Sequence, residues 1–236
     1  MKFFLSCDKS AVYSIDLLFF SFDMDDVRIL DDLAAEPALH QVYARMGFKP
    51  RRAEIPVSMR NLVEDVLQLG RKLVRPRAIF RHCGIVQMHQ DGIELEDGWR
   101  ITSVKVRSWM EDCHSLYAAA VTLGPDLDRR VLELSSGGDV TRAFLLNAYG
   151  AEAAEALMES LDAHLAKLES QRGFSTIKRY SPGYGDWRIS AQKELLDHLG
   201  ADRIGIQLTD SFLMIPEKSV SAIIGVRPVS TITRSA

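Results

Sequence analysis

One short segment concentrates residue types that bind small charged ligands. Residues 179–187 read Arg-Tyr-Ser-Pro-Gly-Tyr-Gly-Asp-Trp. The fork of a guanidinium can grip a carboxylate through two parallel hydrogen bonds, and a tyrosine offers a ring face together with a hydroxyl. The sequence therefore predicts a site for a small zwitterionic or aromatic ligand around Arg179 and Tyr184. An unusual but purely structural turn is the alternative.

The middle of this segment predicts a rigid corner. Proline presets φ for the second position of a turn, and glycine accepts the positive φ that a type II turn needs at the third. Ser181 to Tyr184 should form such a turn, with Arg179 and Tyr184 on either side of it. Glycine at position 183 would also let the backbone come close to a ligand.

Other familiar catalytic patterns are absent or incomplete. Gly183-Tyr-Gly185 lacks the third glycine of a dinucleotide-binding fingerprint, and the Gly-x-Ser-x-Gly nucleophile motif does not occur. Asp162-Ala-His164 partly mimics a cobalamin-ligating Asp-x-His-x-x-Gly pattern, but Lys167 stands in place of the glycine. We therefore assign no catalytic residue and no corrinoid ligand from these patterns.

The cysteines and histidines show no metal-binding spacing. The three cysteines, Cys7, Cys83 and Cys113, form no CxxC pair, and no histidine pairs with another histidine or a cysteine at helical spacing. The sequence predicts no metal site. A sparse, odd number of cysteines favours reduced thiols and a cytoplasmic protein, with Cys83 and Cys113 as small core residues.

Composition narrows the class of protein. The chain has 236 residues, 47% of them hydrophobic, and a net charge of −3 without a concentrated basic face. We expect no nucleic-acid partner. The apolar run near residues 17–22 is too short for a membrane span, and acidic residues interrupt it. We interpret residues 1–24 as an N-terminal extension, either an extra strand, a poorly ordered segment or a mis-assigned start.

The elements that must position the 179–187 segment follow from hydrophobic periodicity. Helical spacing of apolar residues predicts helices over 36–46, 58–73, 126–134, 140–168 and 190–199. Strand-like runs cover 27–30, 77–88 and 116–122, with short strands around the turn signals at 90–92 and 96–98 and two more in 206–226 around Pro216. Because segment 116–122 is apolar almost throughout, both of its faces should be covered. This mixture predicts an α+β fold, with residues 25–236 as a single domain whose mostly antiparallel or mixed sheet is packed by helices.

Two ordered blocks of the chain resemble a known family. Arg179-Tyr-Ser-Pro-Gly183-Tyr184 resembles the Arg-x-x-x-Gly-Tyr signature of the activation domain of cobalamin-dependent methionine synthase. Residues 208–221, Leu-Thr-Asp-Ser-Phe-Leu-Met-Ile-Pro-Glu-Lys-Ser-Val-Ser, are similar to a second segment of that domain. Ala154-Glu155-Ala156 is similar to its acidic helix position. The resemblance covers roughly residues 25–227 and is to the free-standing form of the domain.

The resemblance implies a function and a role for each site residue. The domain binds S-adenosylmethionine as methyl donor and restores methylcobalamin from the inactive cob(II) state, with one electron from a flavodoxin-like donor. Arg179 would hold the carboxylate of the ligand, and Glu155 would face its amino or sulfonium charge. The backbone around Ser181 and Gly183 would complete the cradle, and Tyr184 would lie towards the corrinoid.

The same resemblance implies a partner. Homocysteine, folate and cobalamin modules are not recognisable in this sequence, so we expect action in trans on a methionine synthase or another corrinoid protein that carries the cobalamin. The tyrosine pair that follows Ser-Val-Ser in the fused family is absent here, where the chain continues as Arg227-Pro-Val-Ser. A non-catalytic module that binds a small ligand or docks on a corrinoid protein is the alternative.

Overall fold

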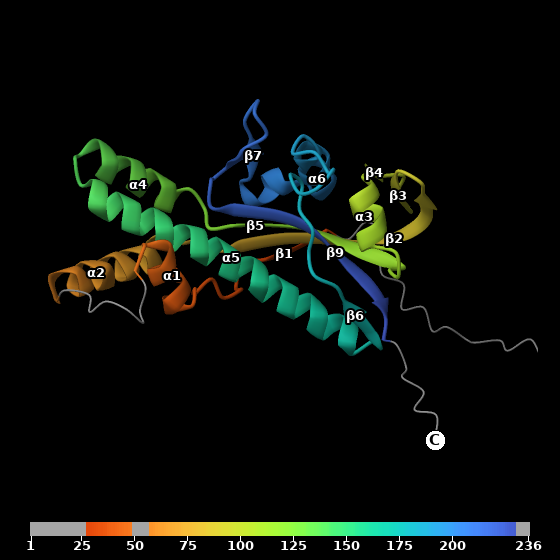
Figure 1. Cartoon of the computed structure of the whole chain (residues 1–236), viewed down its shortest axis with the longest axis horizontal. Coiled ribbons are helices and arrows are strands. Elements are labelled where there is room, and N and C mark those ends of the chain that lie inside the picture. The colour runs from red at the N-terminus through yellow and green to blue at the C-terminus, as the bar shows by residue number, and fades with distance from the viewer. Residues whose placement is uncertain (1–26, 49–56, 230–236) are drawn as a thin grey trace, which may run out of the picture.

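The computed structural model describes residues 27–48 and 57–229, which form a large antiparallel sheet with helices on both faces (Figure 1). The sheet has seven strands in the order β4-β3-β2-β5-β9-β6, and β1 pairs with β2. The predicted α+β class with a mostly antiparallel sheet is confirmed. The strands of this sheet are β1 (Arg28–Leu30), β2 (Arg77–His89), β3 (Gly92–Leu95), β4 (Arg100–Thr102), β5 (Ser115–Thr122), β6 (Phe174–Thr176) and β9 (Ser219–Pro228).

The central strand β5 shows why the sheet is covered on both sides. All of its residues are buried, as its apolar sequence predicted. Tyr117, Ala119 and Val121 belong to one hydrophobic core, while Leu116 and Ala118 belong to another. Alternate side chains of a strand point to opposite faces, so β5 contributes to both cores.

The first face of the sheet is covered by four helices. They are α1 (Leu39–Arg45), α2 (Val57–Leu73), α4 (Asp126–Ser136) and α5 (Val140–Ser170), and their apolar residues share one core. The long helix α5 begins where the Asp139 side chain accepts a hydrogen bond from the Arg142 N–H at 3.1 Å, which satisfies a free donor of the first turn. It crosses the sheet diagonally in Figure 1 and extends the helix predicted over 140–168 by two residues.

The second face carries shorter elements. These are α3 (Val104–Trp109), α6 (Ala191–Leu199) and the 3₁₀ turn at Ala201–Ile204. They pack on the face of the sheet opposite α5 (Figure 1). Helix α6 ends at Gly200, whose φ of 62° is the left-handed conformation that glycine adopts at helix ends.

The segment before Pro216 differs from expectation. The sequence predicted two strands in 206–226, whereas β7 (Gln207–Leu208) and β8 (Met214–Ile215) form a separate small hairpin before the long strand β9. The polar turn accounts for the difference, because the Thr209 hydroxyl and carbonyl accept hydrogen bonds from the N–H groups of Leu213 and Phe212.

The predictions for the N-terminal extension and for the cysteines differ in whether the described residues test them. The N-terminal extension 1–24, together with Cys7, lies outside them. Cys83 and Cys113 are buried, as expected of core residues. No helix within residues 27–48 and 57–229 is both long enough and apolar enough to cross a membrane.

Candidate functional site

Arg179 lies where the chain leaves β6 and runs along the edge of β9. Tyr180 and Ile223 exchange both backbone hydrogen bonds at 2.9 Å, so the extended chain stays on the sheet at this point. Successive side chains of an extended chain point to opposite faces. Tyr180 therefore packs with the second core, while Arg179 reaches the side of α5.

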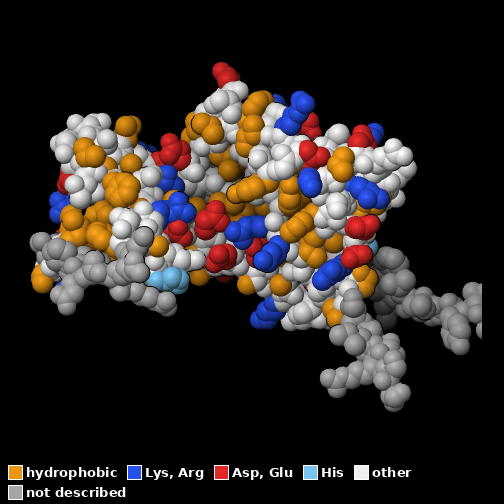
Figure 2. Space-filling model, viewed as in Figure 1, with side chains coloured by type: hydrophobic (Ala, Val, Ile, Leu, Met, Phe, Trp, Pro, Cys, Tyr) orange, Lys and Arg blue, Asp and Glu red, His pale blue; other side chains and the backbone are white. Residues whose placement is uncertain are grey.

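Two carboxylates of α5 hold the Arg179 guanidinium. Its Nη2 lies 2.7 Å from Glu155 Oε2, and its Nη1 lies 2.5 Å from Asp162 Oδ2. Glu155 and Asp162 are about two helical turns apart, so both face the same side of α5. The structure thus brings the predicted residues Glu155 and Arg179 into direct contact. In the view of Figure 2, acidic and basic side chains gather along the middle of α5.

The electrostatics of this cluster favour a ligand with a positive group. Burial raises the pKa of the Asp162 carboxyl, and the hydrogen bond and charge of Arg179 oppose that rise. Burial alone would lower the pKa of Arg179, but Asp162 and Glu155 together raise it. One oxygen of Asp162, Oδ1, is buried and has no hydrogen-bond partner among the residues that the structure describes. The side chains of Arg179, Glu155 and Asp162 together carry a net negative charge. The unpaired Asp162 oxygen can accept a hydrogen bond from a cationic donor.

Asp162 is the site residue that sequence reasoning missed. In the sequence it belongs to the Asp162-Ala-His164 pattern, which lacks the glycine of a corrinoid-ligating motif. Its spacing of seven residues from Glu155 on one predicted helix was the available signal, because residues at that spacing share a helix face.

The predicted corner at Ser181–Tyr184 is present. The Tyr184 N–H donates to the Ser181 carbonyl at 3.4 Å, and Gly183 has φ of +94°, as the third position of a type II turn requires. The Tyr184 side chain is 68% exposed at the tip of the corner. The backbone that should cradle a ligand is thereby fixed, and beside it the exposed Tyr184 ring makes an edge-to-face contact with the Tyr180 ring, with centroids 6.5 Å apart.

Two residues at the end of the segment anchor it to the second face. Trp187 is 2% exposed, and its ring stacks on Tyr180 with ring centroids 6.3 Å apart. Asp186 accepts hydrogen bonds from the Ser103 hydroxyl at 2.5 Å and from the N–H groups of Val104 and Lys105 at 2.8 and 3.1 Å. These bonds, the one from Ser103 first, hold the pKa of Asp186 below its usual value. The carboxylate therefore ties the segment to the start of α3.

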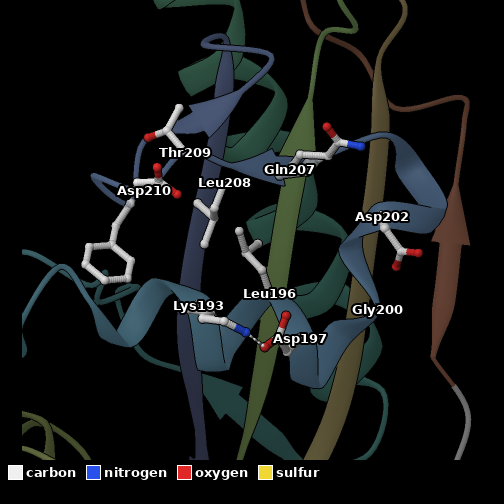
Figure 3. A pocket seen from close by; sticks show the side chains of 11 residues that line it. Lys193, Leu196, Asp197, Gly200, Asp202, Gln207, Leu208, Thr209 and Asp210 are labelled. Atoms are coloured by element: carbon white, nitrogen blue, oxygen red, sulfur yellow. Dashed lines mark hydrogen bonds and ion pairs between the residues drawn. The ribbon is translucent and has the colours of Figure 1, made fainter.

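A separate groove lies between α6 and the β7–β8 hairpin. Figure 3 shows the side chains that line it, and its volume is about 620 Å³. Lys193 and Asp197, on its α6 side, pair with each other at 2.5 Å, so their charges are already matched. None of the five predicted site residues lines it, although four residues of the second matching block do, namely Leu208, Thr209, Asp210 and Phe212. We centre the site on Arg179, because the ionised groups there are partly buried and carry unbalanced charge.

A comparison with protein families decides the affiliation. The family described as the activation domain of vitamin B12 dependent methionine synthase matches residues 105–232. This chain belongs to that family. The matched residues include Glu155, Asp162 and the whole of 179–187, so the ionised cluster and its anchored loop both lie in the part of the chain that defines membership.

Solved structures agree on the fold. The crystal structure titled as the MetH reactivation domain bound to AdoHcy superposes with a TM-score of 0.63 at 18% sequence identity, covering 87% of this chain and 79% of that one. At this identity the likeness establishes the fold alone. No curated protein sequence matches this chain.

Proposed function

We propose that this chain binds S-adenosylmethionine and supports the reductive methylation of cob(II)alamin, acting in trans on a cobalamin-dependent methionine synthase or a related corrinoid methyltransferase. Membership of the activation-domain family carries the proposal. The structurally similar MetH reactivation domain is bound to AdoHcy, which is what S-adenosylmethionine becomes when it gives up its methyl group.

The ionised cluster fits the amino acid end of S-adenosylmethionine. Arg179 is already engaged by Glu155 and Asp162. A zwitterion can bind here without reducing the number of ion pairs. Its carboxylate replaces one acidic partner of the guanidinium, and its ammonium group pairs with the carboxylate that is released. A simple anion would meet two carboxylates beside the arginine. The cluster therefore selects a ligand that carries both charges.

The positive charge of the sulfonium is a second reason why this cluster fits S-adenosylmethionine. S-adenosylmethionine carries one more positive charge than its demethylated product, and the cluster of Arg179, Glu155 and Asp162 is net negative. We infer that the methyl donor binds more tightly than the product, so that loss of the methyl group favours release. Ser181 and Gly183 would approach the ligand through their backbone.

Tyr184 and its neighbourhood fit a macromolecular partner. Tyr184 and Ile189 are 68% and 44% exposed, and Ile189 Cδ1 lies 3.3 Å from the position that a Cβ on Gly183 would take. Exposed apolar side chains at the tip of an anchored loop are typical of contact surfaces. This surface would face the corrinoid protein, which holds the cobalamin, while a flavodoxin-like protein supplies the electron. We further propose a cytoplasmic role in methionine biosynthesis.

In the proposed reaction one electron and one methyl group restore methylcobalamin on the partner. The carbon–sulfur bond of the sulfonium breaks, its electron pair stays on sulfur, and S-adenosylhomocysteine is released. This chain contributes binding and orientation of the methyl donor, which is why none of its residues is assigned a catalytic role.

Two measurements test the proposal in order. Calorimetric titration of the full chain with S-adenosylmethionine should give saturable heat, and folded protein without heat at millimolar ligand would refute it. A spectral assay with reductant and a corrinoid protein in the cob(II) state should then show methylcobalamin only when both this chain and the methyl donor are present. Binding without methylation would support the passive module instead.

A further inference from the structure

A thiol, an imidazole and a carboxylate meet on the second face of the sheet, away from Arg179. Cys83 lies on β2, Asp97 in the turn between β3 and β4, and His198 in the last turn of α6. One ligand atom from each of the three lies within 4.8 Å of the other two. Cys83 Sγ is 3.4 Å from His198 Nε2, and His198 Nδ1 is 3.4 Å from Asp97 Oδ2.

The surroundings fix these groups but leave one side open. Cys83 is 2% exposed, whereas the side chains of His198 and Asp97 are 10% and 20% exposed. The ring of Trp99 lies against the His198 ring with centroids 4.4 Å apart, and the backbone N–H of Trp99 donates to Asp97 Oδ1 at 3.1 Å. A small ion can therefore reach the cluster past Asp97, while the imidazole is held in place.

The order thiol, imidazole, carboxylate also occurs in nucleophilic enzymes, but this cluster does not suit that chemistry. A nucleophile must contact a substrate, and a thiol that is 2% exposed cannot reach a carbon centre.

The distances suit a metal ion instead. Zinc binds cysteine sulfur at about 2.3 Å and histidine nitrogen at about 2.0–2.1 Å, which at a tetrahedral angle places the two ligand atoms about 3.6 Å apart. The observed separation of Cys83 Sγ and His198 Nε2 is 3.4 Å. Asp97 supplies an oxygen within reach, although it also pairs with Arg81 at 3.3 Å and would have to shift towards the ion.

We propose that Cys83, Asp97 and His198 bind one borderline-soft divalent cation of the Zn²⁺ class, with a water molecule as fourth ligand. Binding replaces the thiol proton, which leaves to solvent, and joins α6 to β2 and to the β3–β4 turn. The sequence alone predicts no metal site because the ligands stand at positions 83, 97 and 198, and only the fold brings such distant positions together. The proposal is independent of S-adenosylmethionine binding.

Cobalt(II) is the probe that reports both the ligands and the geometry. Metal-free full chain titrated with Co²⁺ should develop a thiolate-to-metal charge-transfer band and the strong visible bands of a four-coordinate ion, saturating at one ion per chain. Added Zn²⁺ should abolish both. Bound metal should also raise the thermal unfolding temperature, since a ligand of the native state stabilises it.

Variants separate the site from adventitious binding. Cys83→Ala should lose the charge-transfer band, while Cys113→Ala, which removes the other buried thiol of the described residues, should keep it. Asp97→Asn, at the more exposed ligand, should weaken binding by roughly 10- to 100-fold. A metal-free unfolding transition like that of the parent chain will show that each variant is folded. Absence of the band in the parent, its persistence in Cys83→Ala, or unchanged affinity in Asp97→Asn would overturn the proposal.

Discussion

At the scale of single residues, the candidate site depends on an arginine that already has two acidic partners. Arg179 makes hydrogen bonds to Glu155 and Asp162, and its side chain is 25% exposed. A ligand must exchange with these partners rather than fill an empty space. The guanidinium of Arg179 is thus already oriented for binding, because it needs little reorientation when the carboxylate of a ligand replaces Glu155 or Asp162.

Replacing this arginine should weaken ligand binding strongly. Arg179→Ala removes charge-assisted hydrogen bonds to the ligand carboxylate, which contribute about 1.5–3 kcal/mol, so affinity for S-adenosylmethionine should fall roughly 10- to 150-fold. Arg179→Lys should recover only part of it, because an ammonium lacks the planar fork. Calorimetry measures both. Arg188→Ala, at an exposed arginine just beyond the same segment, should bind like the parent chain, and equal losses in Arg188→Ala and Arg179→Ala would argue against the assignment.

Asp162 should govern the preference for the charged methyl donor. Asp162→Asn keeps the shape of the side chain but removes one negative charge from the cluster. Because S-adenosylmethionine carries a sulfonium and S-adenosylhomocysteine does not, the substitution should weaken the former more than the latter. The ratio of the two dissociation constants, measured with each variant, is the test. A ratio unchanged in Asp162→Asn would place the sulfonium elsewhere.

At the scale of elements, the candidate ligand-binding segment 179–187 is held by α3 on the second face of the sheet. Asp186 accepts hydrogen bonds from three donors at the start of α3, so helix and segment are positioned together. Removal of the carboxylate should loosen residues 179–187 and reduce affinity for S-adenosylmethionine, although Asp186 is not expected to touch the ligand. Hydrogen exchange should show faster exchange at residues 180–187 in Asp186→Ala. Slower or unchanged exchange there would contradict the anchoring role.

The packing of α4 on α5 depends on a glycine. A Cβ at Gly150 would lie 2.6 Å from Leu127 Cδ2, which is too close without a shift. Gly150→Ala should gain up to about 1 kcal/mol from helix propensity but lose about 1–3 kcal/mol to overpacking, so the free energy of unfolding should fall. Asn147→Ala, on the exposed side of the same helix, should be neutral or stabilising. Urea unfolding of both variants compares them, and a stabilised Gly150→Ala would show that the helices can separate easily.

Elements were easier to predict from the sequence than the contacts between them. The strand at 115–122 and the helix at 140–170 follow from local apolar patterns. These patterns are enough to predict the two elements, because the spacing of the buried side chains within each element reveals its type. The pairing of Arg179 with Asp162, the anchoring of Asp186 on α3 and the meeting of Cys83 with His198 depend on the topology of the sheet. Such contacts join residues distant in sequence, and no local spacing encodes them.

At the scale of the whole molecule, the two faces of the sheet have different roles. The first face carries the long helix whose carboxylates hold Arg179, and the second carries the anchors of the segment and the cluster of Cys83, Asp97 and His198. The segment 179–187 passes between them at the edge of β9. The candidate site therefore keeps its arrangement only while the sheet as a whole is folded.

That stability should depend on pH through a histidine inside the sheet. His82 on β2 donates to or accepts from the Ser115 hydroxyl at 2.9 Å, and its ring lies against that of Tyr117 with centroids 4.9 Å apart. Burial lowers the pKa of His82 below its usual value of 6.5, although the nearby Glu169 opposes this. The native state therefore resists taking up a proton at this position.

The sign of the effect follows from proton linkage. Below about pH 6.5 the unfolded chain binds a proton at His82 that the folded chain does not, so the free energy of unfolding decreases as the pH falls towards the folded pKa. One such group changes the free energy of unfolding by at most about 1.4 kcal/mol per pH unit. Urea unfolding at about pH 7.5 and about pH 5.5 should show the loss, and His82→Gln should reduce it. His40→Gln, at an exposed histidine, should leave the pH dependence as it is in the parent chain. A parent-like slope in His82→Gln would mean that other groups make the sheet sensitive to acid.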